Sequence, residues 1–179
     1  MVGRSGRIRP AGEPYGSTVD ISDYRHAGSI VVARPADEVY DLVADVTNMG
    51  RWSPVCTGAS FDPDDPTWFT GSNAIGSATW TTRCRVVAAE RGREFAFVNH
   101  GVDGRHELVR WGFAFEPVAG GTEVTETWEV LPSYEQGFAA EGEGAGSLTD
   151  RLDFMRGLAV DGIGETLERL KQHAEASDL

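Results

Sequence analysis

The sequence predicts an α+β domain in which a curved antiparallel sheet of about seven strands wraps around a long C-terminal helix. Between residues 67 and 131, strand-length segments of alternating apolar and polar residues follow one another, with short turns between them. Residues 148–175 then carry apolar residues at helical spacing. A sheet with one apolar face needs a cover, and this helix supplies it.

The first part of the chain is predicted to be a tail. Residues 1–25 are rich in Gly, Arg, Ser and Pro and show no periodicity, which is typical of a flexible segment. Tyr15, Ile21 or Tyr24 is expected to tuck part of this tail against the body. The rest of the chain, residues 26–179, is predicted to form a single domain, as its length favours.

A short strand over 29–33 and two short helices are expected next. The helix over 34–46 has Pro35 in its first turn, where proline is tolerated. Its apolar residues follow i, i+3, i+4, i+7 spacing: Val39, Leu42, Val43 and Val46. A second short helix over 47–56 is expected to end before Pro54.

The middle of the chain reads as a meander of antiparallel strands. "FDPDDP" at 61–66 is a turn cluster, and "GSNAIG" at 71–76 fits a hairpin better than a phosphate-binding loop. Hairpin-like punctuation separates the strand-like segments. These segments lie near 67–71, 76–89, 93–99, 106–117 and 121–131.

Residues 133–147 are predicted to be a long Gly- and Glu-rich loop. Loops of this length are usually functional or disordered, so Tyr134 and Phe138 belong either to a lid or to a disordered segment. Ser147 and Asp150 resemble a capping box, with Asp in place of the usual Glu or Gln, and mark the start of the long helix.

Charge and composition exclude several classes of function. The 179 residues carry 16 basic and 28 acidic side chains, a net charge of −12, which repels phosphate backbones and argues against nucleic acid as a partner. No apolar run has the length of about 18 residues that a membrane span needs, so stable membrane insertion is not expected. The N-terminus lacks the apolar stretch of a secretory signal, and a cytoplasmic location is therefore the default expectation.

No cofactor and no metal site is expected. The chain contains no Walker loop, dinucleotide fingerprint or nucleophile elbow. His100 and His106 flank a turn, but no third His or Cys stands at a useful spacing. Cys56 and Cys84 would pair only if the fold brought them together, and a cytosolic chain would keep them reduced.

One acid stands in an apolar row. In "GGTEVTETWEV", residues 120–130, Glu126 shares a strand face with Val124 and Trp128. Burying a carboxylate without a partner costs several kcal/mol unless it is protonated or hydrogen-bonded. Two interpretations remain open. Glu126 is a structural acid near a sheet end or paired with an Arg, or it faces an interior cavity with a raised pKa and serves as a ligand contact or a general acid/base.

The same alternation gives inward rows on the other strands and on the helix. They contain Trp80, Thr82, Cys84 and Val86; Phe95, Phe97 and Asn99; Glu107, Val109, Trp111, Phe113 and Phe115; and, on the helix, Leu152, Met155, Ala159, Gly162, Ile163, Thr166 and Leu170. The helix is small around Ala159–Gly162, and its glycines have two explanations: a close crossing of the sheet, or room left for a ligand.

The element order, with "RPADEVYDLVADVTNMGRWSP" (34–54), "TTRCRVVAAERGREFAFV" (81–98) and "WGFAFEPVAGGTEVTETWEV" (111–130), resembles the SRPBCC superfamily. This is the START-domain and pollen-allergen-like group with a helix-grip fold, and the branch looks like the polyketide cyclase/dehydrase-like proteins. The resemblance covers about 27–175. It implies a hydrophobic cavity between the sheet and the long helix that takes small apolar or aromatic molecules.

The resemblance and the inward rows together define the expected cavity. Its expected lining, in addition to Glu126, is Trp52, Trp80, Thr82, Cys84, Phe95, Phe97, Asn99, Glu107, Val109, Trp111, Phe113, Trp128, Met155, Ala159, Gly162 and Ile163. The function expected first is binding of a polyketide- or lipid-like molecule by a monomer or homodimer. The alternatives are a polyketide cyclase, aromatase or dehydratase in which Glu126 moves protons, and a protein-interaction module, which would need an exposed apolar patch.

Overall fold

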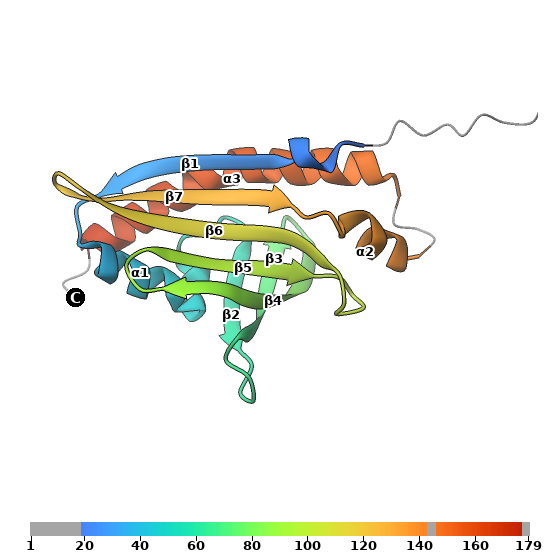
Figure 1. The fold of residues 1–179 in the computed structure, drawn as a ribbon, viewed down its shortest axis with the longest axis horizontal. Helices are drawn as coiled ribbons and strands as arrows, with labels where there is room; N and C mark the ends of the chain where they lie inside the picture. Colours follow the sequence, from blue (N-terminus) through green and yellow to red (C-terminus); the bar gives the residue numbers. More distant parts are fainter. Residues whose placement is uncertain (1–18, 143–145, 177–179) are drawn as a thin grey trace, which may run out of the picture.

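The computed structural model describes residues 19–142 and 146–176, which form one seven-stranded antiparallel sheet curved around a long helix (Figure 1). The strand order is β1-β7-β6-β5-β4-β3-β2. The strands are β1 (Arg25–Val32), β2 (Cys56–Phe61), β3 (Trp68–Ile75), β4 (Ala78–Glu90), β5 (Glu94–His100), β6 (Glu107–Val118) and β7 (Gly121–Val130). The helices are η1 (Ile21–Asp23), α1 (Ala36–Ala44), η2 (Val46–Arg51), α2 (Tyr134–Ala140) and α3 (Leu148–Ala176). The predicted α+β helix-grip fold is confirmed.

The segments on either side of β1 differ in their bounds from those expected. β1 begins at Arg25 rather than near residue 29, because it pairs with β7 along its whole length, from Arg25–Glu129 to Val32–Thr122. Tyr24 is buried just before it and Ile21 packs partly against the core, while Tyr15 lies outside the described residues.

The two short helices after β1 are present, with changed limits. Pro35 is the N-cap residue of α1 rather than part of its first turn, and Val39 and Val43 are buried as the spacing predicts. The second is the 3-10 helix η2. Asp45 is its N-cap residue and accepts a hydrogen bond from the Thr47 amide (3.1 Å).

Residues 56–61 form β2, an edge strand that the sequence did not indicate. They pair with β3 from Cys56–Asn73 to Phe61–Phe69, with an irregularity between Cys56 and Gly58. A short strand with glycine and alanine near its middle gives no clear alternation of apolar and polar residues, so its pairing with β3 decides its conformation.

The predicted loop over 133–147 is wrong in its first half, which is helix α2. Gly137 packs so tightly on β6 that an added Cβ would lie 2.3 Å from Leu108 Cδ2, and Tyr134 is buried. Docking on the sheet therefore outweighs the low helix propensity of glycine. The predicted start of α3 is confirmed, since the Asp150 amide donates to Ser147 Oγ at 3.3 Å.

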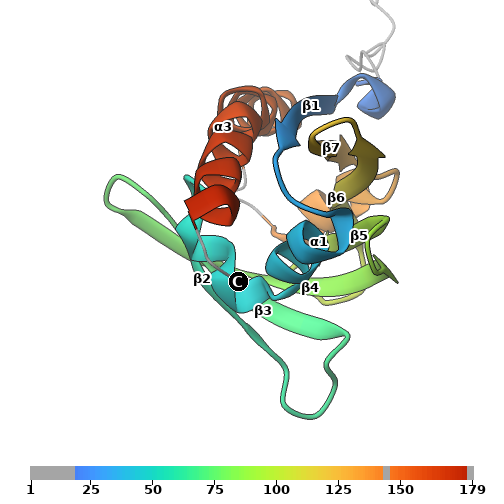
Figure 2. The same ribbon diagram turned by 90° about the vertical axis from the view of Figure 1, so that its left-hand side faces the viewer.

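Helix α3 lies on the β1 side of the sheet rather than across its centre. Figure 2 shows α3 beside β1, with β2, β3 and β4 on the other side of the interior. Three hydrogen bonds tie the helix along β1: Tyr24 Oη to Asp153 (3.1 Å), Lys171 Nζ to Val31 O (2.5 Å) and the Ala33 amide to Glu175 (2.8 Å). Helix α3 therefore packs on the β1 end of the sheet, and β2–β4 lie across the core from it (Figure 2).

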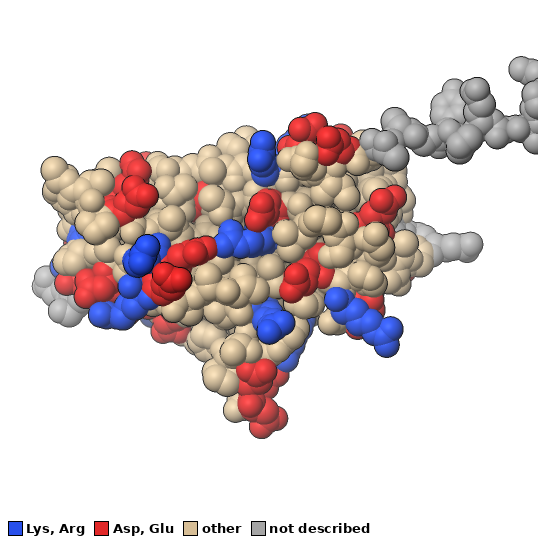
Figure 3. Space-filling view, viewed as in Figure 1, with Lys and Arg blue, Asp and Glu red and all other residues tan. Residues whose placement is uncertain are grey.

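The outer face of the sheet carries acidic and basic groups interspersed among uncharged residues (Figure 3). Arg110, for example, bridges Glu94 at 2.5 Å and Glu129 at 3.8 Å. Exposed ion pairs of this kind contribute little to stability, so the outer face is a solvated surface and the fold depends on its interior.

Candidate functional site

Glu126 lies in the middle of β7, on the face of the sheet that is turned to the interior. It pairs directly with Gly28 on β1 and with Phe113 on β6. Only 4% of its surface is exposed, and its Oε2 atom has no hydrogen-bond partner among the described residues. The structure thus places a single carboxyl group in an apolar part of the core.

Burial raises the pKa of Glu126 well above its ordinary value. Desolvation penalises the charged form of a carboxyl group, and no ion pair to Glu126 within the described part of the chain offsets that penalty. Glu126 lies in the middle of β7 and has no Arg partner within residues 19–142 and 146–176. Its interpretation as an acid near a sheet end or paired with an Arg is therefore wrong. A protonated carboxyl group offers both a donor and an acceptor to a neighbour.

The inner face is organised in rows that cross the strands, as the alternation predicts. Gly28, Glu126, Phe113 and Phe95 form one row. Trp128, Trp111 and Phe97 form the next, and Val130, Val109, Asn99 and Cys84 the one after it. The middle row is thus aromatic, with Glu126 in the row on one side of it and Asn99 in the row on the other.

Several inner-face residues keep accessible surface although their neighbours are buried. Trp111 is half-buried, whereas Trp128 and Phe97, its partners on either side, are 2% and 7% exposed. Thr82 and Asn99 on the inner face and Met155 on α3 are half-buried as well. Accessible space therefore adjoins the inner face at Trp111, Thr82 and Asn99.

Two of the predicted lining residues lie at the edge of this region. Trp80 follows the inward alternation of β4, but it is 39% exposed near the β3–β4 hairpin, which places it at the rim. At Glu107 the alternation is interrupted, because a bulge pairs Glu107 with His100 while Asn99 pairs with Val109. Glu107 therefore does not continue the inner row that contains Val109.

A short ladder of polar side chains connects the inner faces of β3, β4 and β5. Asn73 Nδ2 donates to Thr82 Oγ1 (3.3 Å), and Cys84 Sγ donates to Asn99 Oδ1 (3.2 Å). Burial raises the pKa of the Cys84 thiol to about 12. Asn73 was not among the residues expected from the sequence, although extending the inward alternation of β3 beyond Gly71 includes it.

Trp52, Ala159 and Ile163 belong to the same buried core as the inner-face residues. Ala159 and Ile163 are buried, and Trp52 from the end of η2 is 2% exposed and packs against His173. Tyr134 of α2, assigned to a loop in the sequence analysis, donates a hydrogen bond from Oη to Met155 Sδ at 3.0 Å.

The glycines of α3 do not mark a close crossing of the sheet. A Cβ at Gly157 or Gly164 would meet nothing within 4 Å, and one at Gly162 would lie 3.6 Å from Pro54. The close approach lies instead at Gly28 of β1, where a Cβ would come within 2.9 Å of Ile163 Cγ2. A close crossing of the sheet therefore does not explain why α3 contains these glycines.

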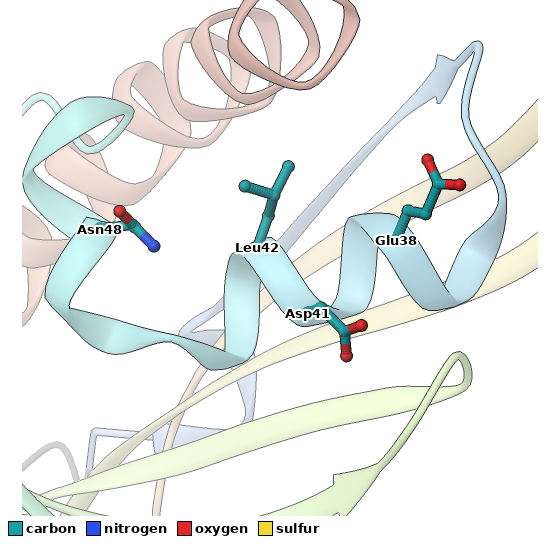
Figure 4. Close-up of a pocket in the computed structure, with 4 residues that line it drawn as sticks. All are labelled: Glu38, Asp41, Leu42 and Asn48. Carbon is teal, nitrogen blue, oxygen red and sulfur yellow. The ribbon is translucent and has the colours of Figure 1, made fainter. Parts of the chain in front are cut away.

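A separate surface hollow lies beside α1 and η2 (Figure 4). It is lined by Glu38, Asp41, Leu42 and Asn48 and has a volume of about 260 Å³. Arg91 holds Asp41 at 2.5 Å, and Asp45 accepts from Asn48 at 2.8 Å, so these polar groups already have partners.

The two histidines considered as metal ligands have other neighbours. His106 Nδ1 lies 2.7 Å from Asp103 Oδ2, and the ring of His100 packs on Trp68 with centroids 4.7 Å apart. Within residues 19–142 and 146–176, no group of three or more His, Cys, Asp or Glu residues is arranged to hold a metal ion.

A curved antiparallel sheet, a short helical segment after β1 and a long C-terminal helix packed on the β1 end of the sheet define a helix-grip protein. The chain belongs to the family described as "polyketide cyclase / dehydrase and lipid transport", whose model matches residues 25–175. The predicted SRPBCC resemblance is thereby confirmed. No curated protein matches the sequence.

Solved structures agree with this assignment. The solution structure of a polyketide-cyclase-like protein from Corynebacterium glutamicum is 35% identical, covers 85% of this chain and 91% of its own, and superposes with a TM-score of 0.57. A START superfamily protein from Mycobacterium smegmatis (16% identity, 84% and 97% coverage, TM-score 0.59) shares the fold. So does the Zhui aromatase/cyclase from Streptomyces sp. R1128 (17% identity, 84% and 93% coverage, TM-score 0.58).

Proposed function

We propose that this protein binds a small hydrophobic or aromatic molecule, polyketide- or lipid-like, between its sheet and α3. The observation that carries the proposal is Glu126, a buried carboxyl group with an unpartnered Oε2 in an apolar face. A few polar groups on an apolar wall are typical of sites for small molecules. The half-buried Trp111 in the row beside Glu126 supplies accessible aromatic surface.

A second candidate, from the enzyme class, is a cyclase, aromatase or dehydratase that acts on a polyketide-like substrate. The raised pKa of Glu126 favours it, because a carboxyl group that keeps its proton can act as a general acid. In this mechanism the protonated carboxyl group gives its proton to a carbonyl or departing hydroxyl oxygen. The carboxylate that forms then takes a proton from carbon, which restores the acid. The inner face would hold the flexible chain folded for reaction.

The remaining expectations set the context for this proposal. The net charge of −12 argues against a nucleic-acid partner, and a monomer or homodimer in the cytoplasm is the simplest setting. Among the residues that the structure describes, no helix is long and apolar enough to cross a membrane. A protein-interaction module has less support, because Glu126 and the aromatic row of Trp128, Trp111 and Phe97 are turned inward.

A thermal-shift screen of wild type and Glu126→Gln against aromatic polyketides, flavonoids, sterols and fatty acids tests the proposal. A ligand at 100 times its Kd adds about 2.7 kcal/mol to stability. In a domain of this size that raises Tm by about 5–10 °C. A shift that Glu126→Gln weakens supports Glu126 as a ligand contact. No shift with any of these classes would overturn the binding proposal.

Turnover of any hit, followed by mass spectrometry, separates binding from catalysis. If the protein is an enzyme, wild type converts the hit and Glu126→Gln binds it without converting it. If wild type leaves every hit unchanged, the enzymatic candidate fails and the binding protein remains. Glu123→Gln, which changes an acid on the opposite face of β7, is the matched control.

A further inference from the structure

His26 lies on the inner face of the sheet, close to Glu126. Along β1, exposed residues alternate with half-buried ones, and His26 and Gly28 both belong to the half-buried set. His26 pairs with Trp128 and Gly28 pairs with Glu126. The imidazole therefore stands at the β1 end of the aromatic row, on the same face of the sheet as the buried carboxyl group.

The strand register sets the separation of these two groups. His26 and Glu126 are diagonal neighbours on one face of an antiparallel pair, because Gly28 and not His26 is the direct partner of Glu126. Diagonal neighbours of this kind have Cβ atoms about 7 Å apart, a span that long and aromatic side chains can bridge. Opposite charges at such a separation, in a surrounding of low dielectric constant, couple their titrations.

Both groups keep atoms that are free to bond. The ring nitrogens of His26 have no partner among the described residues, yet they are not among the buried unpartnered atoms, which belong to His100 and Glu126. Both ring nitrogens therefore retain accessible surface. The same comparison separates the two oxygens of Glu126, because Oε2 is buried and unpartnered whereas Oε1 keeps some accessible surface.

The other charged groups near His26 are turned outward. The stretch of α3 beside it begins near Asp153, to which Tyr24 Oη donates at 3.1 Å, and Asp153 also pairs with Arg156 at 3.4 Å. The charged side chains at neighbouring positions of α3, β1 and β7 are exposed or lie on the outer face: Asp153, Arg156, Asp161, Arg25 and Glu129. Within the described part of the chain, Glu126 is thus the ionisable group that adjoins His26 on the inner face.

We propose that His26 is a positioning residue for Glu126: the imidazole and the carboxyl group share a proton, and the imidazolium form stabilises the carboxylate. This inference rests on the enzymatic candidate of the proposed function and deepens it. When Glu126 gives its proton to a substrate oxygen, a carboxylate remains in an apolar surrounding, which is costly without a positive charge nearby. His26 supplies that charge and keeps its own proton, and Glu126 then takes its proton back from carbon.

The titration of His26 tests the pair without any ligand. Nitrogen-15 NMR of the imidazole rings follows the four histidines from about pH 5 to about pH 9 in wild type and Glu126→Gln. The control is Glu123→Gln, which changes an acid on the opposite face of β7. His26→Gln identifies the signals of His26 by their loss, and thermal melts check that each variant is folded.

In wild type the His26 signals should follow two steps, because coupled groups titrate as a pair. The upper step belongs to the imidazolium that the Glu126 carboxylate holds. It should lie at an about tenfold lower proton concentration than the single step expected in Glu126→Gln. Glu123→Gln should keep both steps. If His26 titrates alike in wild type and Glu126→Gln, the pair is overturned, whatever the protein binds.

Turnover of the compounds found in the thermal-shift screen tests the role of the pair in catalysis. His26→Gln should lower kcat at least about tenfold, and the kcat of wild type should fall as pH rises through the upper step. His26→Lys, which keeps a positive charge to higher pH, should restore part of kcat and move this fall to higher pH. If His26→Gln keeps the kcat and pH profile of wild type, the positioning role is overturned and the enzymatic candidate stands. If wild type turns over no compound, the enzymatic candidate and the role of His26 in it are both overturned, whatever the titration shows.

Discussion

Gly28 and Glu126 are direct partners across β1 and β7, and the glycine lies where side chains of α3 pack closely on the sheet. A Cβ on Gly28 would lie 2.9 Å from Ile163 Cγ2 and 3.5 Å from Leu167 Cδ1. Because the residue beside Glu126 has no side chain, the helix can lie directly over that end of the row. Ile163 and Leu167 of α3 therefore pack next to the row that contains the buried Glu126.

Gly28→Val is expected to destabilise the fold by about 1–3 kcal/mol, because the added methyl groups force α3 away from β1. Chemical denaturation measures the change. Ile163→Ala makes room for the new side chain, so the double variant should be more stable than the sum of the two single changes by at least about 0.5 kcal/mol. Strict additivity would mean that the two side chains do not compete for the same space.

The stability of the protein is expected to fall as pH rises, through Glu126. Because the folded-state pKa is raised, the folded protein keeps a proton that the unfolded chain releases above its ordinary pKa near 4.5. The contribution of Glu126 is therefore fully present below that pH and is lost as pH rises towards the folded pKa. Glu126→Gln, which does not titrate, should therefore gain Tm relative to wild type as pH rises above about 5.

Melting curves of both proteins across this pH range measure the effect, and Glu123→Gln serves as the control on the other face of β7. A constant difference between wild type and Glu126→Gln at every pH would show that Glu126 ionises in the folded protein as it does in water. That result would also remove the argument for Glu126 as a general acid.

Gly157→Ala and Gly164→Ala are each expected to stabilise the protein. An added Cβ meets no atom within 4 Å at either position, and alanine favours a helix over glycine by about 0.8–1.0 kcal/mol. Each change should therefore raise Tm by about 2–4 °C. A lower Tm for either variant would indicate that the glycine is needed for a contact other than those made by the described residues.

The sequence predicted the fold because the strongest patterns lie in the sheet and the last helix. Alternation over β4–β7 placed Phe95, Phe113 and Trp128 on the inner face, and the register agrees. It failed where packing rather than pattern decides the structure. Residues 134–140 look like a loop by composition and become helical because Gly137 fits against Leu108.

The candidate site could be predicted only in part. The position of Glu126 in an apolar row was visible in the sequence. The lack of a hydrogen-bond partner for its Oε2 atom was not, because that depends on how every other strand and helix packs. The bulge at Asn99–His100 interrupts the alternation at Glu107. One extra residue in a strand cannot be predicted from a pattern of period two. The accessible space beside Trp111 depends on the position of α3 over β1, which periodicity leaves open.

Native thiol labelling should be slow at pH 8 and should report on opening of the inner face. Cys84 is 2% exposed with a pKa of about 12, and burial also raises the pKa of Cys56. Since the thiolate is the reactive form, Cys84 in the folded protein should react about a thousandfold more slowly than a free cysteine.

Cys56→Ser isolates this reaction, and denaturant should restore the normal rate. Rapid labelling of Cys84 without denaturant would instead show that the row of Asn99 opens freely to solvent, so that a ligand there would not be shielded from water.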